Sequence, residues 1–343
     1  MKKCSTALWC LTAALSLPAF ATPTCTFLSS APDAHLVTRG DTLWDIASRF
    51  LQNPWCWPQV WALNRDQIRN PHWIYPGQKI VFDRQLGILR IEGGDHASGA
   101  ANIEKLSPTA RTEPLPAASP VPFMNPRLLA MAANYRLAST ADVTRAPRIL
   151  GFSERRRIAS AGDIALVDGR LDSSKTFDVV RALNPVIDPD DGAVLGVPLR
   201  RVGRARLMSS EGLHRFEILE VDSELMAGDL LLRAEVWPTP QLFPHAAAQI
   251  DGKVATVLQD GRWASQNDVV AINRGLRSGL DAGSVVSVMR PVRIVANDLP
   301  TKPSSQSVAA LLLFAVFERT AFALVMRSND VFSAGDAIRA AGP

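Results

Sequence analysis

Residues 35–83 constrain the fold of this chain more than any other stretch, because strand, turn and helix signals follow one another there without a gap. Residues 36–37 predict a short strand. Gly40 permits a tight turn, and either of the next two residues can cap the helix that follows. The apolar side chains of 43–50 fall at i, i+3, i+4 and i+7, which is the spacing of one helix face.

A second helix and a second strand complete this stretch. Asn53-Pro54 ends the first helix, and Pro58 suits the first position of another, which Asn70-Pro71 ends. Tyr75-Pro76-Gly77-Gln78 predicts a β-turn, and residues 79–82 predict a strand. The predicted order is therefore strand, helix, helix, strand.

This segment resembles the LysM domain, a small βααβ module that binds N-acetylglucosamine-containing glycans such as peptidoglycan and chitin. The matching motifs are GDTLWDIA at 40–47, Leu63-Asn64 and IYPGQKI at 74–80. The resemblance covers about a seventh of the chain. It departs from the family pattern at His35, where an aromatic residue is commoner, and at the inserted NPWCWP of 53–58. The run NRDQIRNP at 64–71 resembles one in envelope LysM proteins of Gram-negative bacteria.

The resemblance implies a shallow glycan groove between the loop after the first strand and the loop before the second. Carried over to this chain, the candidate residues are Gly40, Asp41, Thr42 and Leu43 in the first loop and Asn70, Pro71, His72, Trp73, Ile74 and Tyr75 in the second. Acetamido groups need backbone hydrogen-bond partners, and a pyranose face needs a flat apolar surface. Three of these residues also have a structural interpretation. Asp41 suits a helix cap, His72 suits a solvated turn, and Trp73 suits either the core or the surface. Such binding needs no catalytic residue, cofactor or metal ion.

Residues 1–21 have the three parts of a secretory signal peptide. Lys2-Lys3 begins it, an apolar run follows over 6–17, and Ala19-Phe20-Ala21 provides a cleavage site after Ala21. The apolar run is too short for a membrane span, which needs about 20 residues. We therefore expect an exported protein in the periplasm or otherwise associated with the cell envelope, with no transmembrane span in the mature chain.

Cleavage leaves two of the four cysteines, Cys25 and Cys56. An even pair in an oxidising compartment predicts a disulfide. The alternative is two unpaired thiols, with Cys56 buried between Trp55 and Trp57. Neither cysteine is a candidate nucleophile, because no histidine and acid pattern accompanies it.

The charge of the mature chain is close to neutral. Loss of Lys2 and Lys3 lowers Lys+Arg from 37 to 35 against 33 Asp+Glu, so the net charge falls from +4 to +2. That value is too small to support binding to nucleic acid or to a membrane by charge alone.

The rest of the chain divides into a linker and a β-rich region. Residues 84–125 are rich in proline and predict an exposed spacer, in which 86–91 adds a strand to the preceding module. Asn125-Pro126 predicts the start of a helix running to about Leu137. Residues 126–343 are otherwise mainly β, with short β-branched runs broken by glycine and aspartate.

A short sequence motif is repeated within the β-rich region. Ala-Gly-Asp precedes an apolar strand at 161–163, 227–229 and 334–336, and 281–284 is a weaker copy. Residues 214–229 also align with 321–336 without a gap. The structural interpretation is a repeated turn in which glycine supplies the conformation and aspartate caps it. The functional alternative is a carboxylate of a duplicated active site.

The sequence as a whole predicts an α+β chain with an N-terminal βααβ LysM-like module, a Pro-rich linker and a C-terminal region of repeated small β modules. Three functions fit it: non-enzymatic peptidoglycan binding, a cell-wall hydrolase targeted by its LysM module, and an adaptor that binds another envelope protein through residues 126–343. A metal or Cys-His hydrolase is disfavoured, because 140–343 contain no cysteine and only two histidines, His214 and His245. We favour wall binding with an adaptor role.

Overall fold

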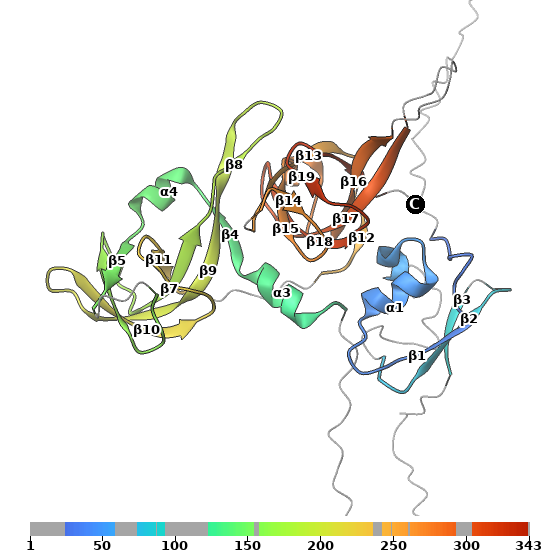
Figure 1. The fold of residues 1–343 in the computed structure, drawn as a ribbon, viewed down its shortest axis with the longest axis horizontal. Helices are drawn as coiled ribbons and strands as arrows, with labels where there is room; N and C mark the ends of the chain where they lie inside the picture. The colour runs from blue at the N-terminus through green and yellow to red at the C-terminus, as the bar shows by residue number, and fades with distance from the viewer. Residues whose placement is uncertain are drawn as a thin grey trace, which may run out of the picture.

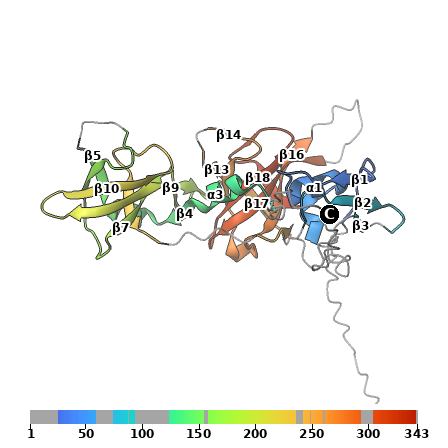
Figure 2. The same ribbon diagram turned by 90° about the horizontal axis from the view of Figure 1, so that it is seen from below.

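A computed structural model describes much of the chain between residues 25 and 341. The described ranges are 25–58, 74–86, 88–92, 123–153, 158–235, 242–247, 249–259, 261–292 and 304–341. The predicted signal peptide, most of the helix predicted after Pro58 and the linker residues 93–122 lie outside them. The described residues form an N-terminal unit and two β-barrels, and the second barrel lies between the other two bodies (Figures 1 and 2).

The N-terminal unit packs one helix against a small sheet. Its elements are β1 (Ala34–Leu36), α1 (Leu43–Phe50), η1 (Pro54–Cys56), β2 (Lys79–Asp83) and β3 (Ile88–Glu92). β2 lies between β1 and β3 in an antiparallel sheet. Thr42 caps α1: its Oγ1 accepts the Asp45 N–H at 3.1 Å and donates to the Asp45 carboxylate at 2.7 Å. The apolar face of α1 is buried, as its periodicity predicts.

β3 carries this unit past residue 83, where the sequence placed the end of the module. It pairs with β2 from Lys79↔Glu92 to Asp83↔Ile88. The strand lies within the 84–125 segment, close to the strand predicted at 86–91. The N-terminal unit therefore ends at Glu92 or beyond.

Two short helices and a strand connect the N-terminal unit to the first barrel. They are α3 (Pro126–Ala133), β4 (Tyr135–Ala138) and α4 (Thr140–Arg145). Asn125 caps α3 by accepting the Arg127 N–H at 2.9 Å. The predicted end of this helix near Leu137 is wrong, because Tyr135–Ala138 pairs with a barrel strand instead.

The first barrel is a closed cycle of six antiparallel strands. These are β5 (Arg148–Phe152), β6 (Ile164–Asp168), β7 (Thr176–Ala182), β9 (Val194–Ser209), β10 (His214–Val221) and β11 (Leu230–Arg233). β9 pairs with both β7 and β10, which closes the order β9-β10-β6-β5-β11-β7. The short β8 (Val186–Ile187) pairs with the start of β9. Buried rings of Phe177 and Phe216 meet edge to face at 5.3 Å in the core.

The second barrel closes in the same cyclic order. Its strands are β13 (Asp251–Val257), β15 (Val269–Ile272), β16 (Ser284–Val292), β17 (Ser304–Val316), β18 (Ala321–Ser328) and β20 (Ala337–Ala340). Their order, β17-β18-β15-β13-β20-β16, matches that of the first barrel strand for strand. Beside the barrel lie β12 (His245–Ala246), β14 (Trp263–Ala264), η2 (Leu276–Ser278) and β19 (Phe332–Ser333).

The Ala-Gly-Asp segments form one kind of β-turn. In the turns at 160–163, 226–229 and 333–336, the aspartate carboxylate accepts the N–H of the first turn residue at 2.8 to 2.9 Å. The glycine has a positive φ in each. The turn at 265–268 has the same bond at 2.7 Å, with Asn267 at φ 73° in place of glycine. These carboxylates are thus engaged within their own turns.

Each turn also forms two backbone hydrogen bonds with one residue of a neighbouring strand. Gly162 donates to the Ile218 carbonyl at 2.8 Å, and the Asp163 carbonyl accepts the Ile218 N–H at 2.9 Å. The same two bonds join turn 226–229 to Ile149, turn 265–268 to Val325 and turn 333–336 to Val254. Ile149 precedes the turn at 160 by as many residues as Val254 precedes the turn at 265. The two barrels therefore share their hydrogen bonding and spacing as well as their strand order.

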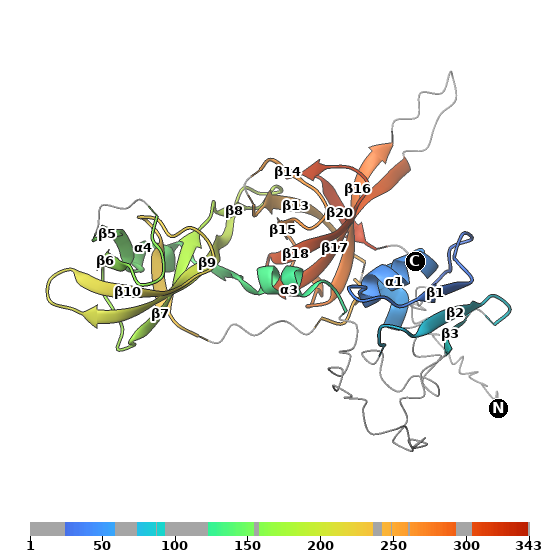
Figure 3. The ribbon, with the colours of Figure 1, turned by 60° about the horizontal axis from the view of Figure 1, so that its bottom comes forward.

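The hairpin of β8 and β9 reaches from the first barrel to the second (Figure 3). Its turn, residues 188–191, carries three aspartates. On the second barrel, Asn273 Nδ2 donates to Asp188 at 2.7 Å, Lys253 Nζ lies 2.9 Å from Asp190, and Arg319 Nη2 lies 3.1 Å from Asp191. Three aspartates of the first barrel thus contact an amide and two cations of the second.

The N-terminal unit packs on the chain that leads into the barrels. The Trp44 N–H, in the first turn of α1, donates to the Phe123 carbonyl at 3.0 Å. The Phe123 ring lies 6.0 Å from the rings of both Trp44 and Trp57. Buried apolar residues continue from here into the second barrel as one hydrophobic cluster. Among the described residues, no helix has the length and apolar character needed to cross a bilayer.

Candidate functional site

The first predicted loop of the N-terminal unit is a β-turn over Thr38–Asp41. The Asp41 N–H donates to the Thr38 carbonyl at 3.2 Å, and the Thr38 N–H donates to the Asp41 carboxylate at 2.9 Å. Gly40 has φ 102°, a conformation that few other residues adopt. The turn exposes Arg39 and Gly40 at the surface.

The second loop ends in a turn of the same kind, over Tyr75–Gln78. The Gln78 N–H donates to the Tyr75 carbonyl at 3.2 Å, and the Tyr75 N–H donates to the Gln78 side-chain carbonyl at 2.9 Å. Gly77 has φ 94°. This is the β-turn that the Tyr-Pro-Gly-Gln sequence predicts.

Val37 holds the two turns side by side. Its N–H donates to the Gln78 carbonyl and its carbonyl accepts the Gly77 N–H, both at 2.8 Å. Because Val37 immediately precedes the first turn, the backbones of the two turns meet at one edge of the unit.

His35 and Asp41 form a half-buried ion pair behind the first turn. His35 Nε2 lies 2.9 Å from Asp41 Oδ2, and the side chains are 13% and 14% exposed. Burial raises the pKa of Asp41, but hydrogen bonds from Thr38 and His35 together outweigh it and leave that pKa below its ordinary value. The carboxylate therefore stays ionised and is held by the turn, which suits a structural group better than a proton donor.

The structure places the remaining predicted residues in three groups. The side chains of Thr42, Leu43 and Ile74 are buried, so a glycan can meet these residues only through their backbone. Tyr75 is half-buried beside Gly77. The other four candidates lie outside the described residues: Asn70, Pro71, His72 and Trp73.

The interior of this unit leaves no room for a sugar. The described residues around it enclose an apolar cavity of about 20 Å³, whose lining includes Leu43, Ile74 and Leu89. Pockets that hold small ligands measure roughly 300–1,000 Å³. This cavity is therefore far too small to hold a sugar.

Two residues near the site were missed by sequence reasoning. Arg39 occupies the second position of the first turn, a placement that the Thr-Arg-Gly-Asp order could have revealed. Phe123 packs against the start of α1 from a segment far along the chain, and no local signal marks that contact.

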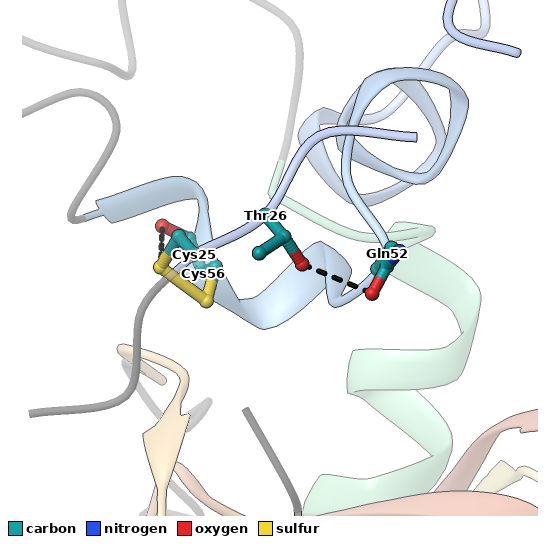
Figure 4. The surroundings of a disulfide bond; sticks show 4 residues. All are labelled: Cys25, Thr26, Gln52 and Cys56. Atoms are coloured by element: carbon teal, nitrogen blue, oxygen red, sulfur yellow. Dashed lines mark hydrogen bonds between the residues drawn. A yellow bond between two sulfur atoms is a disulfide. The ribbon is translucent and has the colours of Figure 1, made fainter. Parts of the chain in front are cut away.

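A disulfide joins Cys25 to Cys56, as the cysteine count predicts (Figure 4). The two Cα atoms are 5.6 Å apart. Thr26 Oγ1 donates to the Gln52 side chain at 3.0 Å, and the Gln52 N–H donates to the Thr26 carbonyl at 3.0 Å. The amino-terminal segment is thus tied to the link between α1 and η1.

The two histidines of the β-rich region belong to different barrels. His214 contacts Ser210 and the Gly169 carbonyl in the first barrel. In the second, His245 Nε2 lies 2.9 Å from Asp281, which also accepts the Ser284 hydroxyl at 2.5 Å. Ser284 is 1% exposed, so this hydroxyl cannot reach a substrate, and the group ties β12 to β16. No cluster of three metal-ligating side chains occurs in the described part of the chain.

Comparisons with known proteins agree on the N-terminal segment. Residues 35–83 match the family described as LysM domain. The chain is also 42% identical over 60 residues to the uncharacterized protein YqbP of Bacillus subtilis (strain 168), a match that covers 15% of this chain and 27% of that protein. The chain thus spans about a quarter of the length of this relative. Residues 35–83 of this chain are therefore a LysM domain, which indicates binding of peptidoglycan or a chitin-like glycan.

Proposed function

We propose that this protein binds peptidoglycan in the cell envelope through its LysM domain, breaks no bond there, and presents its two barrels as an adaptor region for another envelope protein. The observation that carries the binding proposal is the pair of turns that Val37 holds side by side. Both turns have a glycine at positive φ, and no atom lies within 4 Å of the Cβ position of either glycine. A polymer can therefore approach the backbone closely at both.

The chemistry of these turns suits an amino sugar. Acetamido groups exchange hydrogen bonds with backbone N–H and C=O groups, and Arg39 and Gly40 of the first turn are exposed at the surface. The half-buried Tyr75 ring adds an apolar surface beside them. Asp41 is held by His35 and Thr38, so the rim contains no described carboxyl poised to protonate a glycosidic oxygen. This supports recognition without hydrolysis.

Export to the periplasm belongs to the same proposal. Residues 1–21 have the pattern of a signal peptide, and the Cys25–Cys56 disulfide fits a compartment in which thiols oxidise. Mass analysis of protein taken from the periplasm should give a chain that starts at Thr22. A full-length mass in the cytoplasm would contradict this part of the proposal.

A binding experiment with matched glycine variants tests the glycan proposal. Gly77→Val strains the second turn of the LysM domain, whereas Gly162→Val strains the equivalent turn of the first barrel. The two glycines have φ of 94° and 90°, and both have open space at the Cβ position. In pull-downs on purified sacculi with the whole mature chain, Gly77→Val should lose retention and Gly162→Val should keep it. Equal retention of both variants would contradict the site.

The same incubations test for hydrolysis. Soluble muropeptides should not rise above the protein-free blank after incubation of sacculi with the wild-type chain. Their release in proportion to protein concentration would instead favour the hydrolase hypothesis.

The adaptor part needs a partner on the barrels. A photo-crosslinking residue at Leu150, which is 52% exposed on β5, should give a discrete adduct with an envelope protein in intact cells. The same probe at Leu86, which is 62% exposed in the N-terminal unit, provides the comparison. The absence of an adduct at Leu150 would argue against an adaptor.

A further inference from the structure

A groove of about 430 Å³ opens at one end of the second barrel, away from the LysM turns. The end of β13, residues 261–263 and the turn after β19 form its walls. Its volume lies within the range of small-ligand pockets, roughly 300–1,000 Å³. No part of the proposed LysM function uses this groove.

Trp263 offers an aromatic face at the groove. It lies on β14, opposite Ser333 of β19, and is 61% exposed. The next residue, Ala264, is fully buried and pairs with the buried Phe332. The packing of this corner therefore depends on Ala264 and Phe332 and leaves the indole at the surface.

The first barrel shows that its architecture does not require an aromatic residue here. In that barrel the equivalent bridge joins Ala159 to Leu225, and both side chains are buried. Ile158 stands before Ala159 as Trp263 stands before Ala264. Ile158 is also exposed, at 49%. The indole is thus a feature of the second barrel alone, and a large exposed aromatic plate beside a groove suits stacking on a ligand.

Arg262 supplies a cation next to the indole. It lines the same groove, its side chain is exposed, and it forms no ion pair within the described residues. The Thr256 and Ser333 hydroxyls also lie along the lining. A guanidinium recognises a carboxylate by paired hydrogen bonds. The groove therefore combines an aromatic plate, a cation and two hydroxyls.

We propose that this groove binds a carboxylate-bearing saccharide, with Trp263 against a pyranose face and Arg262 on the carboxylate. Assigning that saccharide to the wall polymer rests on the proposed function, because peptidoglycan carries carboxylates on its stem peptides and chitin carries none. Two contacts on one polymer would raise the overall affinity through a high effective concentration at the second site. The groove itself does not depend on the LysM turns.

The test reads the groove separately from the LysM domain. The whole mature chain is labelled with 5-fluorotryptophan, and the Trp263 signal is assigned by its loss in Trp263→Phe. Titration with a soluble disaccharide-peptide from peptidoglycan should shift the Trp263 fluorine signal, whereas neutral chitotetraose should leave it in place. Arg262→Gln should weaken the disaccharide-peptide interaction about tenfold, and Ile158→Ala should leave it unchanged.

The outcomes separate this inference from the LysM proposal. Gly77→Val should abolish retention on sacculi and preserve the Trp263 shift. If the Trp263 fluorine signal does not shift with the disaccharide-peptide, the inference is overturned even if the protein binds sacculi. An equal shift with chitotetraose, or an unchanged affinity in Arg262→Gln, overturns it as well, because the carboxylate would then contribute nothing.

Discussion

Asn273 Nδ2 lies 2.7 Å from Asp188 Oδ1, so a buried amide of the second barrel holds a buried carboxylate of the first. The same amide carbonyl accepts the Lys253 N–H at 2.7 Å. A buried polar group that keeps its partners costs little, whereas one that loses them costs its desolvation. Asn273 is therefore the buried centre of a junction that the ion pairs of Lys253 and Arg319 complete.

Replacement of Asn273 by alanine should weaken this junction. Asp188 loses its closest donor, so we expect the free energy of unfolding to fall by about 1–3 kcal/mol. Denaturant unfolding measures the loss, and small-angle scattering should report a more extended molecule. The control is Arg277→Ala, which breaks an ion pair with Glu318 whose partners are 68% and 73% exposed; it should have little effect. Equal losses in both variants would contradict a special role for Asn273.

Acid should destabilise the LysM domain through Asp41. Its folded-state pKa is lowered by the bonds from Thr38 and His35, although burial alone raises it. A lowered folded pKa gives stability that is present above the unfolded pKa and is lost as pH falls through the folded pKa. The free energy of unfolding of wild type and Asp41→Asn should therefore differ most above pH of about 5 and converge as pH falls below about 4. A difference that stays constant with pH would show that Asp41 acts only as a cap.

Reduction of the Cys25–Cys56 disulfide should loosen the LysM domain. Cys25→Ser with Cys56→Ser should lower its stability by about 3.5–4 kcal/mol, the value that loop-closure entropy gives for a sequence separation of 31. Protein from the periplasm should resist alkylation until a reductant is added. Ready labelling of either thiol without reductant would rule the bridge out in the cell.

Asp229 should matter more than Asp268, which closes the same kind of turn in the second barrel. It is 3% exposed, and Arg181 Nε donates to it at 2.8 Å in addition to the Met226 N–H of its own turn. Asp229→Ala leaves the Arg181 side chain, which is 20% exposed, without its carboxylate partner, so we expect a loss of roughly 2–3 kcal/mol. Asp268→Ala removes the same turn bond without an ion pair and should cost about 1 kcal/mol. Similar losses would show that the turn bond alone accounts for both.

Local signals predicted the parts of the molecule that local bonds build. The Thr42 cap, the apolar face of α1 and the turn at Tyr75–Gln78 each depend on residues only a few positions apart, and the sequence displays all of them. The disulfide followed from counting the cysteines that remain after the predicted signal peptide is removed. The Ala-Gly-Asp turns were visible because glycine and aspartate are rare in strands and common where φ must be positive.

Contacts between distant residues could not be predicted in the same way. The turn at 265–268 escaped notice because Asn267 replaces glycine, although asparagine also tolerates a positive φ. The helix predicted to reach Leu137 ends early because β9 offers Tyr135 a strand partner far along the chain. Closure of the barrels depends on pairings such as β9 with β10 and β16 with β20, which no short pattern specifies.

The packing of Phe123 on Trp44 and Trp57 fixes the orientation of the LysM domain relative to the chain that leads into the barrels. A LysM domain joined to the barrels by a flexible linker alone could bind a glycan strand in many orientations relative to the barrels. Here the backbone bond at 3.0 Å and the two ring contacts anchor the module's first helix to the chain that enters the barrels. In the proposed adaptor role, a partner bound to the barrels would therefore keep a set distance and orientation from the glycan bound by the LysM domain.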